Sequence, residues 1–165
     1  MSEFVINQTT TDLLREIGNI GAAHAATALS EMIGEPVNMR VPWVELVPFD
    51  DVTAVLGGPE QVVACVYLTV RGDITGSMFF VQSVPAAKIL IGELLSDVTP
   101  GENFSELELS ALAEMGNIMS ATYLRSLIDL TNLQMQPSVP LVAVDMAQAV
   151  LAVGLSQDAL VGNYA

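Results

Sequence analysis

Two short patterns in this sequence place a carboxylate and an amide at helical spacing, where the two side chains could act together. Glu16 and Asn19 form the first pair, and Glu114 and Asn117 form the second pair, 98 positions later. An Asn amide offers one acceptor and two donors and does not titrate, so it can orient a water molecule but cannot remove its proton. The Glu supplies a fixed negative charge suited to a Lys or Arg on a partner. This chemistry favours reactions that depend on positioning, such as phosphoryl transfer.

The pattern around each pair is longer than the pair itself. Asp12 precedes the first pair and Ser110 the second, so both copies read Asp/Ser-x3-Glu-x2-Asn. A proline follows each Asn after 23 residues, at Pro42 and at Pro140. With average residue usage, such a four-point pattern arises by chance roughly once per hundred thousand starting positions. Two copies in 165 residues therefore indicate an internal duplication.

On a helix, the three polar positions of each copy stand at i, i+4 and i+7 and share one narrow face. Apolar residues occupy the other positions, so we expect the polar stripe to face solvent. Gly18 and Gly116 stand beside the Asn of each copy, where glycine costs about 1 kcal/mol relative to alanine in a helix. The repeated cost suggests that another surface approaches the helix closely at these two positions.

The elements that must position these residues can be read from periodicity and turn signals. The first motif lies on a predicted helix over 12–33, with Thr11 or Asp12 as N-cap and Gly34 and Pro36 after its end. The second lies on a predicted helix that opens with the capping-box pattern Ser105-x2-Glu108 and runs to about residue 130. The remaining predicted elements are strands 37–41, 44–47 and 53–56, a hairpin of 62–70 with 74–82, a helix over 85–95, extended segments 133–136 and 141–144, and a helix over 146–153.

These elements predict an α/β (α+β) fold in which a pseudo-twofold axis relates two halves. We expect the antiparallel strands of both halves to share one sheet, with the two long motif helices packed on it and exposed on one side. The whole chain, 1–165, reads as a single domain made of two repeats, about 8–98 and 104–165, joined near 99–103. Few residues follow Pro140, so we expect the second repeat to be truncated.

Composition excludes several classes of function. Nineteen acidic residues against five basic ones give a net charge of -14, which disfavours nucleic acid and anionic membranes as partners. The N-terminus lacks a signal peptide and no apolar run reaches 18 residues, so the sequence predicts a cytoplasmic protein. Cys65 is the only cysteine and is predicted to be a buried small hydrophobe. The single histidine, His24, is more typical of a packed or half-exposed side chain than of a catalyst.

The sequence contains no Ser/His/Asp set, Walker loop, dinucleotide-binding turn or His/Cys/Asp cluster at metal spacing. Its cations are scattered, at Arg15, Arg40, Arg71, Lys88 and Arg125. A protein of this composition has no cation cluster for a phosphoryl group. If it acts on one, we expect the Mg²⁺ and the phosphate to arrive on the partner.

The doubled pattern Asp/Ser-x3-Glu-x2-Asn-x22-Pro resembles the signature of the CheC/CheX/FliY phosphatases of bacterial and archaeal chemotaxis. Both copies match it at every signature position, and the resemblance covers nearly the whole chain. Two copies on one chain resemble the CheC type rather than CheX, which has one copy. A fragment of FliY would look much the same.

The resemblance implies hydrolysis of the aspartyl phosphate on the response regulator CheY. It implies that Asn19 and Asn117 orient the attacking water and that Glu16 and Glu114 pair with a lysine of the receiver domain, while Asp12, Ser110, Pro42 and Pro140 support the motifs. It further implies that this protein needs no cofactor of its own, because the Mg²⁺ belongs to CheY. Family members also bind the receptor deamidase CheD, and Asp145 and Met146 resemble part of the region used for that contact.

A different class of function stays open at this point. In the alternative, the protein is a non-catalytic adaptor that binds CheD or a flagellar switch component, as a FliY-like fragment could, and its phosphatase motifs are idle. Decay of labelled CheY distinguishes the two hypotheses, because the adaptor is expected to bind CheD without accelerating that decay.

Overall fold

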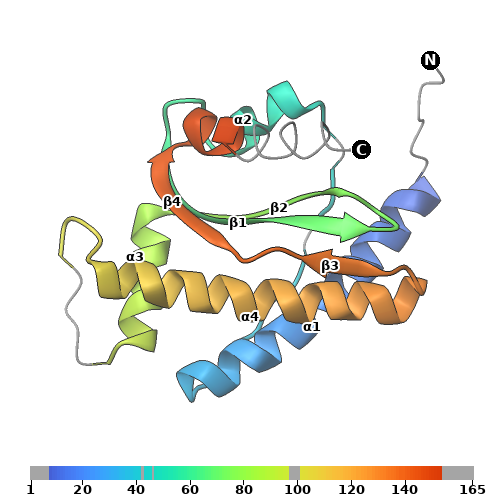
Figure 1. Ribbon diagram of the computed structural model, residues 1–165, viewed down its shortest axis with the longest axis horizontal. Coiled ribbons are helices and arrows are strands. Elements are labelled where there is room, and N and C mark those ends of the chain that lie inside the picture. Colours follow the sequence, from blue (N-terminus) through green and yellow to red (C-terminus); the bar gives the residue numbers. More distant parts are fainter. Residues whose placement is uncertain (1–7, 42, 46, 97–100, 154–165) are drawn as a thin grey trace.

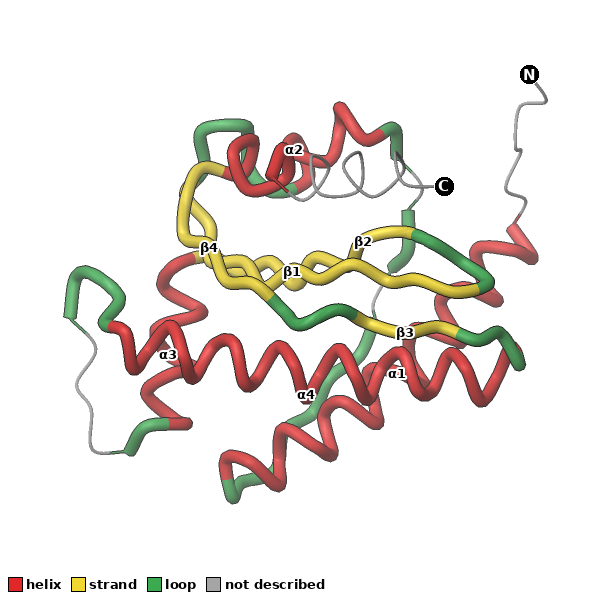
Figure 2. Tube along the Cα trace, viewed as in Figure 1, coloured by secondary structure: helices red, strands yellow, loops and turns green. Residues whose placement is uncertain are grey.

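The computed structural model describes residues 8–41, 43–45, 47–96 and 101–153, and its helices lie on both sides of one antiparallel sheet (Figures 1 and 2). The larger helical layer contains α1 (Gln8–Ile33), α3 (Val84–Leu94) and α4 (Glu106–Thr131). The opposite face carries the short α2 (Val52–Val55), preceded by a 3-10 turn (Phe49–Asp51), and helical residues 147–153. The predicted α+β class, with both motif helices on one side of the sheet, is confirmed.

The sheet is built around one long strand of the first repeat. β1 (Val62–Gly72) pairs antiparallel with β2 (Gly76–Ser83), which confirms the predicted hairpin. On its other side β1 pairs antiparallel with β3 (Met135–Pro137) and β4 (Leu141–Met146), which come from the second repeat. The two repeats therefore form one sheet, in which the strands of the second repeat pair with one edge of β1.

Side chains alternate across β1 and bury both faces of the strand. Ala64 and Val66 face α1, α3 and α4 and belong to the main core cluster, whose centre includes the fully buried Ile91 and Met115. On the opposite face of β1, Ala147 and Val150 pack against the alternate residues of the strand, which are Val63, Cys65 and Tyr67. Cys65 is buried, which confirms its prediction as a buried hydrophobe, and this burial raises the pKa of its thiol to about 12.

The two motif helices are equivalent in extent, since α4 begins and ends 98 residues after α1. The predicted capping box of α4 is confirmed: the Glu108 N–H donates to Ser105 Oγ (3.2 Å), and the Ser105 N–H donates to Glu108 Oε2 (2.6 Å). The predicted end of α1 is also confirmed, with Gly34 in the left-handed region at φ +82°. The predicted N-cap of α1 is wrong, because Thr11 and Asp12 lie inside a helix that already includes Gln8.

Three predicted strands are wrong. Residues 37–41, 43–45 and 47 belong to no strand, and residues 52–55 are helical. Two backbone donors of the first segment bond to α1 instead of a neighbouring strand: the Val37 N–H donates to Ser30 Oγ (2.8 Å), and the Val41 N–H donates to Asn19 Oδ1 (2.7 Å). Further on, Asp50 and Asp51 in the turn before α2 favour a helix start, where carboxylates interact well with the helix dipole.

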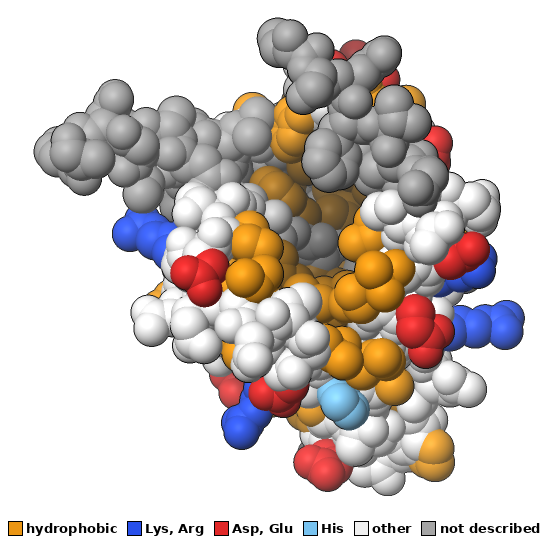
Figure 3. Space-filling model, turned by 90° about the vertical axis from the view of Figure 1, so that its right-hand side faces the viewer, with side chains coloured by type: hydrophobic (Ala, Val, Ile, Leu, Met, Phe, Trp, Pro, Cys, Tyr) orange, Lys and Arg blue, Asp and Glu red, His pale blue; other side chains and the backbone are white. Residues whose placement is uncertain are grey.

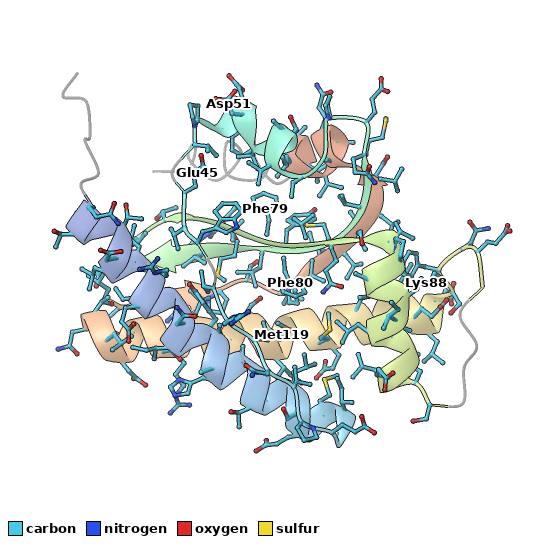
Figure 4. The ribbon with its side chains drawn as sticks, turned by 180° about the vertical axis from the view of Figure 1, so that it is seen from behind. Glu45, Asp51, Phe79, Phe80, Lys88 and Met119 are labelled. Carbon is cyan, nitrogen blue, oxygen red and sulfur yellow. The ribbon has the colours of Figure 1, made fainter. Side chains whose placement is uncertain are left out.

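A buried ion pair joins α3 to the start of α4. Figure 4 labels its lysine, Lys88, on α3. Lys88 Nζ lies 3.1 Å from Glu108 Oε1 and donates to the Asn103 carbonyl at 2.9 Å. The same ammonium group lies 4.0 Å from the centre of the Phe104 ring. Glu108 is only 2% exposed, so this pair holds the N-terminus of the second motif helix in a fixed position.

Within the part of the chain that the structure describes, no helix has the length and apolarity required to cross a bilayer. The predicted truncation of the second repeat concerns residues after 153, which lie outside the described residues.

Candidate active site

The two motif helices pack directly on each other. Gly21 of α1 lies under the ring of Tyr123 on α4, where an added Cβ would stand 2.5 Å from Tyr123 Cδ2. One turn further, His24 Nδ1 lies 2.6 Å from Ser126 Oγ. Because the Ser126 hydroxyl donates to the Thr122 carbonyl (3.0 Å), it accepts the hydrogen of His24 Nδ1. His24 thus links the two helices.

The first motif occupies the exposed side of α1. Asp12 and Glu16 are exposed, and Asn19 is half-buried. Asp12 Oδ1 accepts from Arg15 (2.9 Å) and from Gln8 (3.2 Å). With about half of each side chain exposed, the Asp12–Arg15 pair contributes no more than about 1 kcal/mol to stability. The Asp12 carboxylate, about one helical turn before Glu16, is therefore already paired with Arg15.

The Asn19 amide is bound to the backbone of the protein itself. Its Oδ1 accepts from the Val41 N–H (2.7 Å), and its Nδ2 donates to the carbonyls of Arg15 (3.0 Å) and Val41 (3.4 Å). This arrangement, which we call the Asn19 clasp, fixes residues 37–41 against α1. An amide held in this way has fewer donors and acceptors left for a water molecule.

The second motif occupies the matching side of α4 and is more open. Ser110, Glu114 and Asn117 are all exposed. Unlike Asn19, Asn117 makes no hydrogen bond to any residue that the structure describes. In the second repeat, the residue that corresponds to Val41 is Val139, 98 positions later, and it is 82% exposed. Glu114 and Asn117 therefore present a carboxylate and a free amide to solvent on one helical face.

The glycine beside each Asn faces inward. An added Cβ at Gly116 would lie 2.8 Å from Val66 Cβ, so α4 packs on β1 more closely than any side chain at this position would permit. At Gly18 an added Cβ would lie 3.3 Å from Val41 Cγ2. The predicted close approach is thus confirmed for both glycines, and the surfaces that approach are the sheet and the 37–41 segment of the same chain.

The other predicted residues lie apart from the two pairs. Pro140 is half-buried and immediately precedes β4, whereas Pro42 lies outside the described residues. Asp145 and Met146 are exposed at the end of β4, opposite Val63 and Val62 of β1. Asp145 Oδ1 accepts from the Met146 N–H (2.7 Å). The structure therefore places the predicted partner-binding residues at the sheet and the motif residues on the helices.

An apolar cavity of about 210 Å³ lies behind the Asn19 clasp. Its wall includes Met39 and Val41 of the clasped segment, Met119 and Tyr123 of α4, and Phe80 of β2. Figure 3 shows hydrophobic side chains around a hollow on one face of the molecule, and Figure 4 shows Phe79 and Phe80 on opposite sides of β2. The clasp thus closes one side of an apolar space between the motif helices and the sheet.

The clasp is a feature that sequence reasoning missed. The spacing Asn-x22-Pro contains its signal, because the residue that Asn19 binds is the one directly before Pro42. The same spacing does not produce a described clasp in the second copy. The spacing therefore indicates a possible contact, and the tertiary path of the segment decides whether the contact forms.

Comparison with known proteins agrees with the duplicated site. The CheC-like family profile matches residues 10–46 and 107–143, the two stretches that contain the motifs. The chain is 41% identical to the CheY-P phosphatase CheC of Bacillus subtilis (strain 168) over 165 residues, which cover 97% of this chain and 78% of that protein.

The chain belongs to the CheC-like family.

This CheC-like protein also matches the putative CheY-P phosphatase CheC1 of Halobacterium salinarum, with 28% identity over 71% of this chain and 57% of that protein. Among solved structures it is similar to FliY of Thermotoga maritima, with a TM-score of 0.75, 24% identity, and coverage of 86% of this chain and 71% of the other. This similarity shows that the two proteins share a fold.

Proposed function

We propose that this protein hydrolyses the aspartyl phosphate of the chemotaxis response regulator CheY, with Glu114 and Asn117 as its principal active site. The observation that carries the proposal is the exposed, unclasped Asn117 amide one turn from the exposed Glu114. The Bacillus subtilis relative, which is named a CheY-P phosphatase, supports the choice of substrate.

In this proposal the Asn117 amide accepts from and donates to the attacking water and holds its oxygen in line with the bond to be broken. The phosphoryl group passes from the aspartyl carboxylate to that water, which yields inorganic phosphate and the free aspartate. Glu114 pairs with a lysine of the receiver and fixes the two proteins in register. The Mg²⁺ is supplied by CheY, and no covalent intermediate forms on this protein.

Glu16 and Asn19 form a second, weaker site in the same proposal. Glu16 and Glu114 are both exposed, so docking of the receiver is available at both helices. The Asn19 clasp must open before its amide can orient a water molecule. Asp12, Ser110, Pro42 and Pro140 are proposed to support the motifs without contacting the reacting atoms.

The proposal is tested by the lifetime of CheY labelled with ³²P-acetyl phosphate. We expect catalytic amounts of this protein to accelerate the release of labelled phosphate, and we expect no label on the protein itself at any time. An unchanged CheY-P lifetime would exclude the phosphatase function. The matched control is a Glu16→Gln, Asn19→Ala, Glu114→Gln, Asn117→Ala variant, which loses all four proposed groups and whose folding is checked by circular dichroism.

We also propose that the exposed end of β4 binds CheD. Asp145 and Met146 are both exposed there, with Met146 45% exposed. We expect Met146→Glu to abolish co-elution of CheD with this protein and to leave CheY-P hydrolysis unchanged. Asn117→Ala is the reciprocal control, and it is expected to retain CheD. Co-elution of CheD by a wild-type protein without phosphatase activity would favour the adaptor function instead.

A further inference from the structure

The exposed face that bears Glu114 and Asn117 continues along α4 to Arg125. Ala121 and Arg125 follow Glu114 by 7 and 11 positions and therefore lie on the same side of the helix. Both are exposed. With a rise of 1.5 Å per residue, Arg125 lies about 12 Å from Asn117 along the helix axis. Between them, the short side chain of the exposed Ala121 projects little from the helix.

The first copy provides an internal comparison for this face. Ala23 matches Ala121 at the shared offset, but Thr27 stands where the second copy has Arg125. Thr27 donates its hydroxyl hydrogen to the Ala23 carbonyl (3.0 Å) and so bonds to its own helix. The two motif faces thus differ in charge at one position that lies beyond the shared signature.

Arg125 is available for a partner. In the described parts of the chain it has no ion pair and no hydrogen bond, whereas Arg15 is paired with Asp12 and Lys88 with Glu108. The net charge of the whole protein is -14. A receiver surface around an aspartyl phosphate is also anionic, because it carries the phosphoryl oxygens and the carboxylates that hold Mg²⁺. Two anionic surfaces repel unless a cation is placed between them.

We propose that Arg125 is a specificity-determining residue of the second motif, which binds anionic side chains at the rim of the phosphorylated site on the receiver. The inference rests on the proposed phosphatase function and adds to it a charge difference by which the second motif face would bind the receiver more tightly than the first. Arg125 is too far from Asn117 to touch the reacting atoms, so its effect lies in KM and in the salt dependence of kcat/KM.

The test uses the Asn19→Ala background, in which the second motif is the only site with an intact Asn. We expect Arg125→Thr to raise KM for CheY-P by roughly two- to fivefold, the range of an exposed ion pair, with kcat unchanged. We also expect it to flatten the dependence of kcat/KM on NaCl, and Arg125→Lys to restore KM at low salt. Arg71→Thr removes the same charge from an exposed position at the end of β1 and is expected to leave KM unchanged.

The outcomes separate this inference from the function on which it rests. Equal KM values for Arg125→Thr and Arg71→Thr would overturn the role of Arg125 while the phosphatase function stands. A fall in kcat at constant KM would also overturn it, because that result assigns the residue to the chemical step. Absence of turnover by the unmodified protein would overturn both.

Discussion

Asn117→Ala is expected to lower the turnover of CheY-P by at least about tenfold, whereas Asn19→Ala is expected to lower it by less than about twofold. Removal of one positioned group that acts in the transition state costs a large factor in kcat, often 10²-fold or more. Asn117 is free and exposed, but the Asn19 amide is bound to the backbone of Val41 and Arg15. Single-turnover decay of labelled CheY measures both variants.

The effects of the same two variants on stability should rank in the reverse order. Asn19→Ala leaves the Val41 N–H without its described partner and is expected to destabilise the protein by about 1–2 kcal/mol in urea unfolding. Asn117→Ala removes no described contact and is expected to change stability by less than about 0.5 kcal/mol. Asn103→Ala is a suitable control, because only the backbone carbonyl of this exposed Asn is used, by Lys88.

Equal losses of turnover from both Asn variants would contradict this asymmetry and would show that the clasp opens at no measurable cost. A loss from Asn19→Ala alone would be more serious, because the open second motif could then not be the principal site. The two motifs are equivalent in sequence, so the difference between them tests the geometry of the structure rather than the family signature.

The repeat in the sequence predicted the positions of the two motif helices well. Each helix carries its own apolar periodicity and its own stop or start signal, such as Gly34 after α1 and Ser105 before α4, and these signals act within a few residues. Gly18 and Gly116 could likewise be singled out, because a repeated unfavourable residue in a helix requires a packing reason.

The difference between the two sites could not be predicted in this way. Residues 37–41 read as a strand because they alternate, but their backbone donors at Val37 and Val41 bond to Ser30 and Asn19 across a distance in sequence that periodicity does not detect. Whether an Asn on an exposed face is free depends on the path of that segment. The sequence therefore predicted the candidate residues, and only the structure distinguished a clasped amide from a free one.

Lys88→Met is expected to lower the midpoint of thermal unfolding by roughly 5–10 °C at pH 7. The methionine retains the length of the apolar stem, but it leaves the Glu108 carboxylate buried without its cation. It also removes the donor to the Asn103 carbonyl and the charge above the Phe104 ring. Because this cluster fixes the start of α4, the loss should appear in the unfolding of the whole domain, as followed by circular dichroism.

We expect the acid dependence of stability to identify Glu108 as the titrating member of the cluster. The Ser105 N–H, together with the Ser105 hydroxyl and Lys88, holds the pKa of Glu108 below its usual value of 4.5 despite burial. A depressed pKa stabilises the folded state above the unfolded pKa, and this contribution is lost as the pH falls through the folded pKa. The stability advantage of the unmodified protein over Glu108→Gln should therefore be full at pH 6 and shrink below pH 4.5.

Two further variants serve as controls. Lys88→Met should retain part of the acid dependence, because the Ser105 N–H remains. Glu106→Gln should retain all of it, because Glu106 is an exposed acid in the same helical turn. An unchanged acid dependence in Glu108→Gln would assign the titration to other carboxylates and remove the cluster as its cause.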